Sequence, residues 1–252
     1  MSENPKNYDE LIALLHDALH PDVFFYSANE ARDNVNVGAS RSIVVSADAI
    51  KAVELRNGVT FHCCTPDKFF ATYEISGLTG GRAIDFSVID GPHLFEHVLR
   101  QFINLERFCH HGSVIAIPNV FPQTLTIEQR DPQDDGWADD VYGIILALRT
   151  HRPDLTLMAV DVGSKGMLLF TSLDPQDRIL AARFENIVEK HKRLDYTKLH
   201  AHHEKMLGKM PYSGALLDFL AANLERSRAE KKMDRVKTFL SEDVRVHFGT
   251  RA

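Results

Sequence analysis

Short apolar segments alternate with segments of helical periodicity through most of this chain. The short segments are rich in β-branched and aromatic residues and are bounded by polar or turn residues, as strands are. The segments between them carry apolar residues at three- and four-residue spacing, as one face of a helix does. This alternation predicts a mostly parallel sheet with helices on both faces, which is an α/β fold. The predicted strands are 23–26, 42–45, 59–62, 84–89 and 113–117, and the predicted helices are 8–19, 47–55, 65–73, 94–108 and 139–150.

A hairpin follows the alternating segments. The apolar runs 155–160 and 167–171 are joined by Gly163-Ser-Lys-Gly166, a turn that favours two antiparallel strands. Strand signals then cease at Pro175. We therefore expect two units, an α/β domain of residues 1–175 and a C-terminal helical extension of residues 176–252. The predicted helices of the extension are 180–191, 196–207, 213–228 and 233–240.

The composition indicates a protein of a reducing compartment. Of the 252 residues, 44% are hydrophobic, and the longest apolar runs are too short to span a membrane. The first ten residues are polar and acidic, unlike a signal peptide. The 3 cysteines are too few for a disulfide scaffold. We therefore expect a cytoplasmic location and no membrane partner.

The charge is unevenly distributed along the chain. The formal net charge is −6, with an excess of acidic residues in 1–175 and of basic residues in 176–252. An acidic domain argues against a nucleic-acid partner, because phosphate binding is driven by positive charge. The basic tail indicates either a solvated helical face, which is the favoured interpretation, or a surface for a polyanion or a protein partner.

The best-defined candidate site follows the fourth predicted strand. The segment Ile89-Asp-Gly-Pro-His93 places a carboxylate and an imidazole at the carboxyl end of that strand, where open α/β sheets bind ligands. In a functional interpretation, His93 is a general base for a hydroxyl substrate and Asp90 orients it. In a structural interpretation, Asp90 caps the following helix and His93 has no chemical role.

This motif and the layout of the elements resemble class I S-adenosylmethionine-dependent methyltransferases. In one branch of that family the fourth strand ends in Ile-Asp-Gly-x-His, as Ile89 to His93 do here, and Leu94-Phe-Glu96 matches the start of the next helix. The resemblance covers residues 22–173 and is best in 65–121. It implies a Rossmann-like methyltransferase fold, S-adenosylmethionine as cofactor, and methyl transfer to a hydroxyl of a small molecule or sugar.

The segments that match the family's cofactor loops depart from its pattern. The family places an acidic residue and a glycine-rich turn after the first strand, but residues 23–33 contain no glycine. The second strand ends in Ser46, where the family has an acidic residue that accepts the ribose hydroxyls. Thr65 and Asp67 also suit the start of a helix, as N-cap and first-turn acid. The resemblance assigns the cofactor side to Ser27, Ser46, Thr65 and Asp67.

A divalent metal is a further implication of the resemblance. Catechol-type relatives bind the ion between a carboxylate after strand four and an Asp-Asn pair after strand five. Asp90 matches the first ligand and Asn119 the last, whereas Pro118 replaces the middle carboxylate. One charged ligand makes a poor Mg²⁺ site, because this cation prefers several oxygen ligands.

Two functions follow from these residues. The first is an active methyltransferase, favoured by Asp90, His93 and Asn119. The second is a catalytically inactive methyltransferase-fold protein that works as a binding or assembly module. The second is favoured by the missing acid, glycines and ribose carboxylate, and its C-terminal helices would bind a protein partner.

Overall fold

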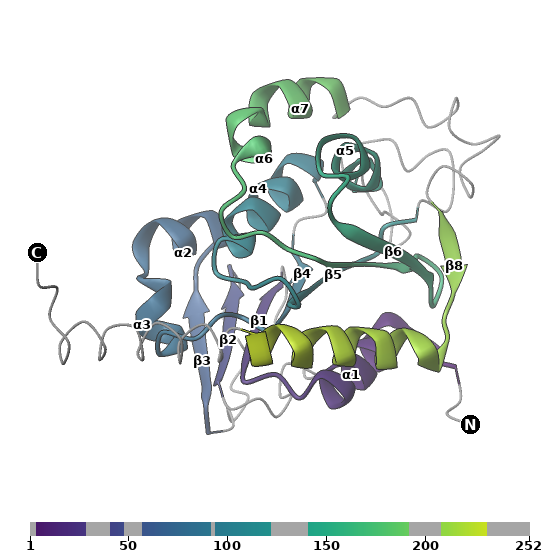
Figure 1. Cartoon of the computed structure of the whole chain (residues 1–252). Helices are drawn as coiled ribbons and strands as arrows, with labels where there is room; N and C mark the ends of the chain where they lie inside the picture. Colours follow the sequence, from purple (N-terminus) through teal and green to yellow (C-terminus); the bar gives the residue numbers. More distant parts are fainter. Residues whose placement is uncertain are drawn as a thin grey trace, which may run out of the picture.

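The computed structural model describes residues 4–28, 41–47, 57–91, 94–121, 141–191 and 208–230. An eight-stranded sheet forms its centre, with helices on both faces (Figure 1). The strand order is β3-β2-β1-β4-β5-β7-β6-β8. The strands are β1 (Val23–Ala28), β2 (Arg41–Ser46), β3 (Val59–Cys63), β4 (Phe86–Asp90), β5 (Val114–Pro118), β6 (Thr156–Asp161), β7 (Met167–Thr171) and β8 (Lys209–Pro211). The helices are α1 (Tyr8–Leu19), α2 (Pro66–Thr72), α3 (Ile75–Thr79), α4 (Phe95–Glu106), α5 (Gly143–His151), α6 (Ile179–Ala182), α7 (Phe184–His191) and a further helix at residues 214–230.

The sheet is mostly parallel, as predicted. Strands β1 to β5 pair in parallel, so their carboxyl ends meet at one edge, which we call the carboxyl edge. The predicted hairpin is confirmed as β6 and β7. Strand β7 inserts between β5 and β6 and runs antiparallel to both. The α/β fold class expected from the alternation is therefore confirmed.

Two local predictions are wrong. Strand β8 pairs in parallel with β6, although only helices were expected after residue 175. Three residues ending in proline are too short to show a strand period, so the sequence gives no signal there. Helix α3 was not among the predicted helices, and it begins after Glu74 because the Glu74 carboxylate accepts hydrogen bonds from the first N–H groups of the helix. The helices predicted at 47–55, 196–207 and 233–240 lie mostly or wholly outside the described residues.

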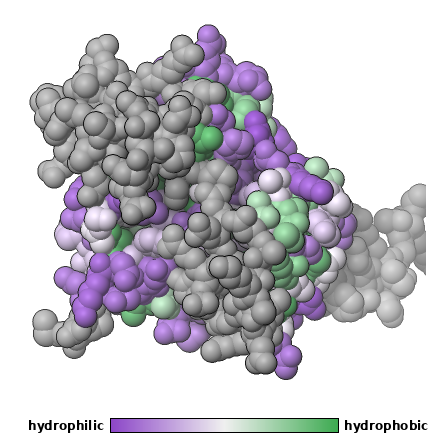
Figure 2. Space-filling view, turned by 180° about the vertical axis from the view of Figure 1, so that it is seen from behind, coloured by the Kyte–Doolittle hydropathy of each residue, from purple (hydrophilic) through white to green (hydrophobic). Residues whose placement is uncertain are grey.

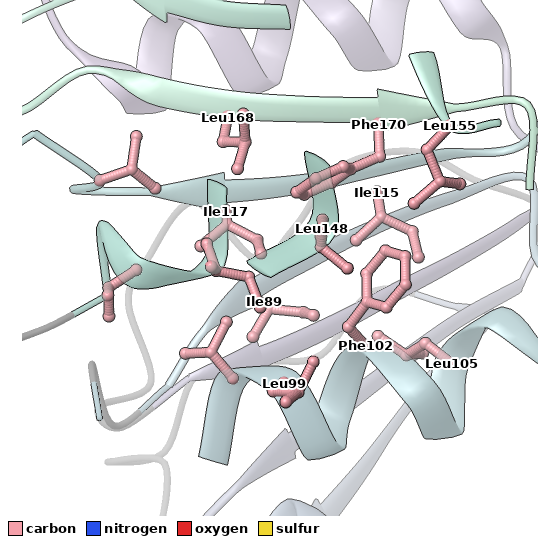
Figure 3. Packing of buried hydrophobic residues seen from close by; sticks show 14 of the residues in the cluster. Ile89, Leu99, Phe102, Leu105, Ile115, Ile117, Leu148, Leu155, Leu168 and Phe170 are labelled. Carbon is pink, nitrogen blue, oxygen red and sulfur yellow. The ribbon is translucent and has the colours of Figure 1, made fainter. Parts of the chain in front are cut away.

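Two apolar layers cover the two faces of the sheet. On one face, α4 and α5 pack against β4, β5 and β7, and Figure 3 shows Phe102 and Leu148 among the strand side chains. On the other face, α1 and the 214–230 helix lie side by side, and their leucines pack against Phe24 and Phe86 (Figure 1). The central strands are therefore buried on both faces, which explains their continuous apolar sequences.

The opposite edge of the sheet, which we call the amino edge, carries a buried polar anchor centred on Asp85. One oxygen of Asp85 accepts hydrogen bonds from the backbone N–H groups of Asp22 and Val23 at 2.8 and 3.1 Å. The carboxylate also pairs with Arg228 at 3.0 Å and with the His110 ring at 3.1 Å. Because Arg228 belongs to the 214–230 helix, Asp85 ties that helix to β1 and β4.

The 214–230 helix approaches the amino edge closely at Gly112. A Cβ at Gly112 would lie 2.6 Å from the backbone oxygen of Asn223 and 2.7 Å from the Cβ of Ser227. The hydroxyl of Ser227 lies 2.9 Å from Nδ1 of His110 and accepts from the Gly112 N–H. Part of the C-terminal extension thus packs directly on the sheet, while the division at residue 175 stays a prediction.

Most of the apolar residues lie in the two buried layers, and the surface of the described residues is largely polar. On the side drawn in Figure 2 this surface is mostly hydrophilic, with hydrophobic residues in smaller areas. Among the described residues, no helix has the length and apolar character that crossing a membrane requires.

Candidate functional site

Asp90 lies at the carboxyl edge, at the end of β4. Its side chain is 4% exposed. The hydroxyl of Tyr26 donates a hydrogen bond to Oδ2 of Asp90 at 2.9 Å. The register of β1 and β4 pairs Ala28 with Asp90, so Tyr26 stands two residues earlier on the same face of the sheet. The sheet register therefore holds this carboxylate where open α/β sheets bind ligands.

Ser27 lies next to Tyr26 but points to the other face of the sheet. It is fully buried, and its hydroxyl donates to Oε1 of Gln101 at 2.7 Å. Gln101 belongs to α4 and is 2% exposed. The predicted cofactor residue Ser27 therefore joins the end of β1 to the helix that follows β4.

Ser46 ends β2, next to β1. It is fully buried, and its backbone oxygen accepts from the Cys64 N–H at 2.9 Å. Cys64, which donates this hydrogen bond, begins the turn between β3 and α2. Burial raises the pKa of the Cys64 thiol, so this group stays protonated at neutral pH and is not an activated nucleophile. Cys63 is exposed and Cys64 is half-buried.

Thr65 and Asp67 both make structural contacts at the start of α2. The hydroxyl of Thr65 accepts from the Lys68 N–H at 3.3 Å and caps α2. Asp67 pairs with Arg100 of α4 at 2.8 Å, and both side chains are 41% exposed. These contacts tie α2 to α4 beside the carboxyl edge. A cofactor role for either residue stays a prediction.

Asn119 follows β5 and has a left-handed backbone, with φ of 60°. Asn adopts this conformation more readily than most residues, which supports its turn interpretation. Its backbone N–H donates to the Gly166 oxygen at 2.9 Å, so it belongs to the junction between β5 and the hairpin. Within the described ranges, no group of three or more His, Cys, Asp or Glu side chains is arranged to hold a metal ion. Mg²⁺ binding at Asp90 and Asn119 therefore stays a prediction.

Four of the predicted site residues lie along one edge of the sheet. The carboxyl ends of β1, β2, β4 and β5 carry Ser27, Ser46, Asp90 and Asn119 along one edge of the sheet. His93 lies outside the described residues. Tyr26 and Gln101 were missed by the sequence reasoning. A signal existed for Gln101, since it is a polar residue three positions after Val98 and four before Leu105, on the buried face of α4.

Comparisons with known proteins identify the fold. No protein-family model matches the chain, and a search of curated proteins finds no match. The structure of cofactor-bound Rv0187 from MTB aligns with a TM-score of 0.51 and 15% identity, over 66% of this chain and 79% of that one. The O-methyltransferase TomG from Streptomyces achromogenes, in complex with SAM, aligns with a TM-score of 0.50 and 15% identity, over 66% and 80%. The chain therefore has the Rossmann-like α/β fold of such methyltransferases.

Proposed function

We propose that this protein is an S-adenosylmethionine-dependent methyltransferase that acts on a hydroxyl of a small molecule or sugar. The observation that carries the proposal is the placement of Asp90, a buried carboxylate that Tyr26 orients at the carboxyl end of β4. In this fold, ligands bind outside the carboxyl ends of the strands. The likeness to the TomG O-methyltransferase fold supports the reaction class.

The described residues fit the cofactor in part. Ser27 and Ser46 lie at the ends of adjacent strands, and the turn at Cys64 and Thr65 follows the next strand, so these residues line up along the edge of the sheet where the cofactor would bind, with both serines fully buried. The end of β2 offers a hydroxyl instead of the carboxylate that would accept both ribose hydroxyls. We therefore assign the cofactor side to Ser27, Ser46, Thr65 and Asp67, with weaker ribose binding than an acidic residue would give.

The proposed chemistry of the chain itself is proton acceptance. S-adenosylmethionine, when bound, supplies a methyl group on a positively charged sulfur. A hydroxyl acceptor must lose its proton as it attacks, and the Asp90 carboxylate accepts that proton, with His93 as a second candidate base. The hydrogen bond from Tyr26 fixes the orientation of the carboxylate. Burial of Asp90 keeps bulk water away and strengthens its interactions with the acceptor.

A metal-assisted route has little support from the described donors. A Mg²⁺ ion needs several oxygen ligands, whereas Asp90 and Asn119 offer one carboxylate and one amide. Asn119 also has a structural role at the β5 junction.

The second candidate function is an inactive methyltransferase-fold protein that binds a partner. Internal contacts of the predicted cofactor residues favour it, since Ser27 bonds to Gln101, Thr65 caps α2 and Asp67 pairs with Arg100. The partner would be a protein that binds the C-terminal helices. On the 214–230 helix, Phe219 is 50% exposed and is an apolar side chain that such a partner would contact. A cytoplasmic location is part of both proposals.

Calorimetric titration of the purified chain with S-adenosylmethionine and S-adenosylhomocysteine separates the two functions. The methyltransferase proposal predicts dissociation constants in the micromolar range and a rise in the unfolding temperature with ligand. If millimolar S-adenosylhomocysteine gives neither heat nor a thermal shift, the methyltransferase proposal fails and the binding module is favoured.

A further inference from the structure

Gln101 is a buried amide on the mostly apolar inward face of α4. The inward residues of α4 include Phe95, Val98, Phe102 and Leu105, all of which pack in the core between α4 and the sheet. Gln101 shares their burial at 2% exposed. A leucine or methionine at this position would pack in the core without any polar group to satisfy. The amide therefore needs a reason beyond packing.

One half of the amide is fixed by β1. Oε1 of Gln101 accepts the hydrogen bond from Ser27 at 2.7 Å. This bond determines which way the carboxamide faces, because its nitrogen must then point away from Ser27. The side chain is thus oriented by a fully buried hydroxyl at the end of the first strand.

The other half of the amide lies against the turn that follows Asp90. A Cβ at Gly91 would lie 3.1 Å from Nε2 of Gln101, which is tighter than ordinary contact. Gly91 does not have a left-handed φ, so its backbone conformation does not require glycine. The Gln101 amide therefore lies close against this turn, and a side chain at position 91 would require the amide to shift by a few tenths of an ångström.

Nε2 of Gln101 has no hydrogen-bond acceptor among the residues that the structure describes. Nε2 is not among the fully buried side-chain atoms without a partner, so solvent reaches it and a ligand can approach it. A ligand oxygen at the carboxyl ends of β1 and β4 would accept its hydrogen bond. The Asp90 carboxylate, an acceptor, lies on the other face of the sheet with Tyr26, so a ligand that spans the carboxyl edge at this turn would meet the Gln101 donor and the Asp90 acceptor.

We infer that Gln101 is a ligand-binding residue, whose amide N–H donates to an oxygen of the molecule bound at the Asp90-Gly91 turn. The inference rests on the proposed function, because the ligand is taken to be S-adenosylmethionine or its product. Ser27 acts as a positioning residue, since it orients the Gln101 amide through Oε1.

The test compares three variants, Gln101→Met, Ser27→Ala and the double variant, by titration with S-adenosylhomocysteine and by thermal unfolding. Gln101→Met removes the donor while keeping length and volume, and we expect a roughly tenfold loss of affinity, the worth of one good hydrogen bond. Ser27→Ala keeps the donor, and we expect a loss of less than about threefold. The double variant leaves neither partner unpaired, so its unfolding temperature should exceed that of Gln101→Met while its affinity stays low.

Three results would overturn the inference. Unchanged affinity in Gln101→Met would show that no ligand oxygen binds the amide. Equal losses in both single variants, with affinity restored in the double variant, would assign the pair a purely structural role. Absence of binding by the unmodified protein would remove the proposed function and this inference together, which distinguishes it from the first two results.

Discussion

Asp85 and Asp90 stand near opposite ends of β4, five residues apart, and their surroundings differ. Asp85 accepts from two backbone N–H groups and pairs with Arg228 and His110, so four segments of the chain meet at its carboxylate. These partners outweigh burial and lower its pKa to about 2. Asp90 accepts from Tyr26, a neighbouring strand residue on the same face. The amino edge is thus built to hold segments together, whereas the carboxyl edge presents polar groups beside a turn.

The difference between the two edges teaches that burial alone does not identify a functional carboxylate. Both aspartates are 4% exposed. What separates them is their place on the sheet: Asp85 is held at the amino edge by groups that include Arg228 of the 214–230 helix, whereas Asp90 lies beside a turn at the carboxyl edge, where open α/β sheets bind ligands. A carboxylate that joins distant segments stabilises the fold, and one at the ligand-binding edge is placed for chemistry.

The largest effect is expected at the carboxyl edge, on activity. Asp90→Asn keeps an acceptor for Tyr26 but removes the proton-accepting charge, so methyl transfer to the acceptor should fall about 10²- to 10⁴-fold. The unfolding temperature should stay within a few degrees of the unmodified protein. The measurement is the rate of S-adenosylhomocysteine formation. A variant that unfolds readily would instead place Asp90 with Asp85 as a structural residue.

Asp85→Asn should lower stability and leave ligand affinity unchanged. It removes the charge that pairs with Arg228, and we expect a loss of about 2–4 kcal/mol in the free energy of unfolding. Chemical denaturation measures this loss. Affinity for S-adenosylhomocysteine, measured where the variant is still folded, should be unchanged. A loss of affinity without a loss of stability would mean that the amino edge acts on the ligand site.

Gly112→Ala tests the close approach of the 214–230 helix at the amino edge. The added methyl group would meet the backbone of Asn223 and the side chain of Ser227, so we expect a destabilisation of about 1–3 kcal/mol. Gly214→Ala is the matched control, because a Cβ there has no atom within 4 Å. Equal stabilities of the two variants would contradict the close packing of this helix on the sheet.

The depressed pKa of Asp85 predicts a pH dependence of stability. The folded value is about 2, below the usual value near 3.9, so the unfolded chain binds the proton first as the pH falls. The stabilisation of about 2 kcal/mol is complete above about pH 5 and is lost as the pH falls toward 2. Between pH 2 and 6, the free energy of unfolding measured by denaturation should depend less steeply on pH in Asp85→Asn than in the unmodified protein. An identical pH dependence of the two proteins would mean that Asp85 is not tightly held.

The smallest effect on stability is expected for Asp67, a carboxylate that lies beside the carboxyl edge and forms an ion pair with Arg100. Its ion pair with Arg100 is 41% exposed on both sides, so Asp67→Asn should change the free energy of unfolding by less than about 1 kcal/mol. Thermal unfolding at low and high salt measures it. A larger loss would place Asp67 with the buried anchor at the opposite edge.

Much of the fold could be predicted from the sequence, because sheet and helix periods depend on local residue patterns. The segments 84–89 and 113–117 match β4 and β5 to within a few residues. The position of Asp90 followed from the strand that precedes it. Strand β8 could not be predicted, since its pairing with β6 depends on tertiary contact and not on its own three residues.

The side-chain contacts of the candidate site were less predictable. Tyr26 reaches Asp90 through the register of two strands 64 positions apart, and no local pattern encodes that register. Gln101 could be noticed as a polar residue on an apolar face, but its partner Ser27 could not. The caps of short helices were readable at Thr65, where the residue types themselves carry the signal.

The contact between Arg228 and Asp85 has a consequence for how the chain is made. Its two residues are 143 positions apart, so the contact forms only after residue 228 has left the ribosome. Until then the sheet face bearing Phe24 and Phe86 lacks the helix that covers it. We expect slow folding and a transient need for chaperones during synthesis, and a chain truncated before residue 214 should aggregate.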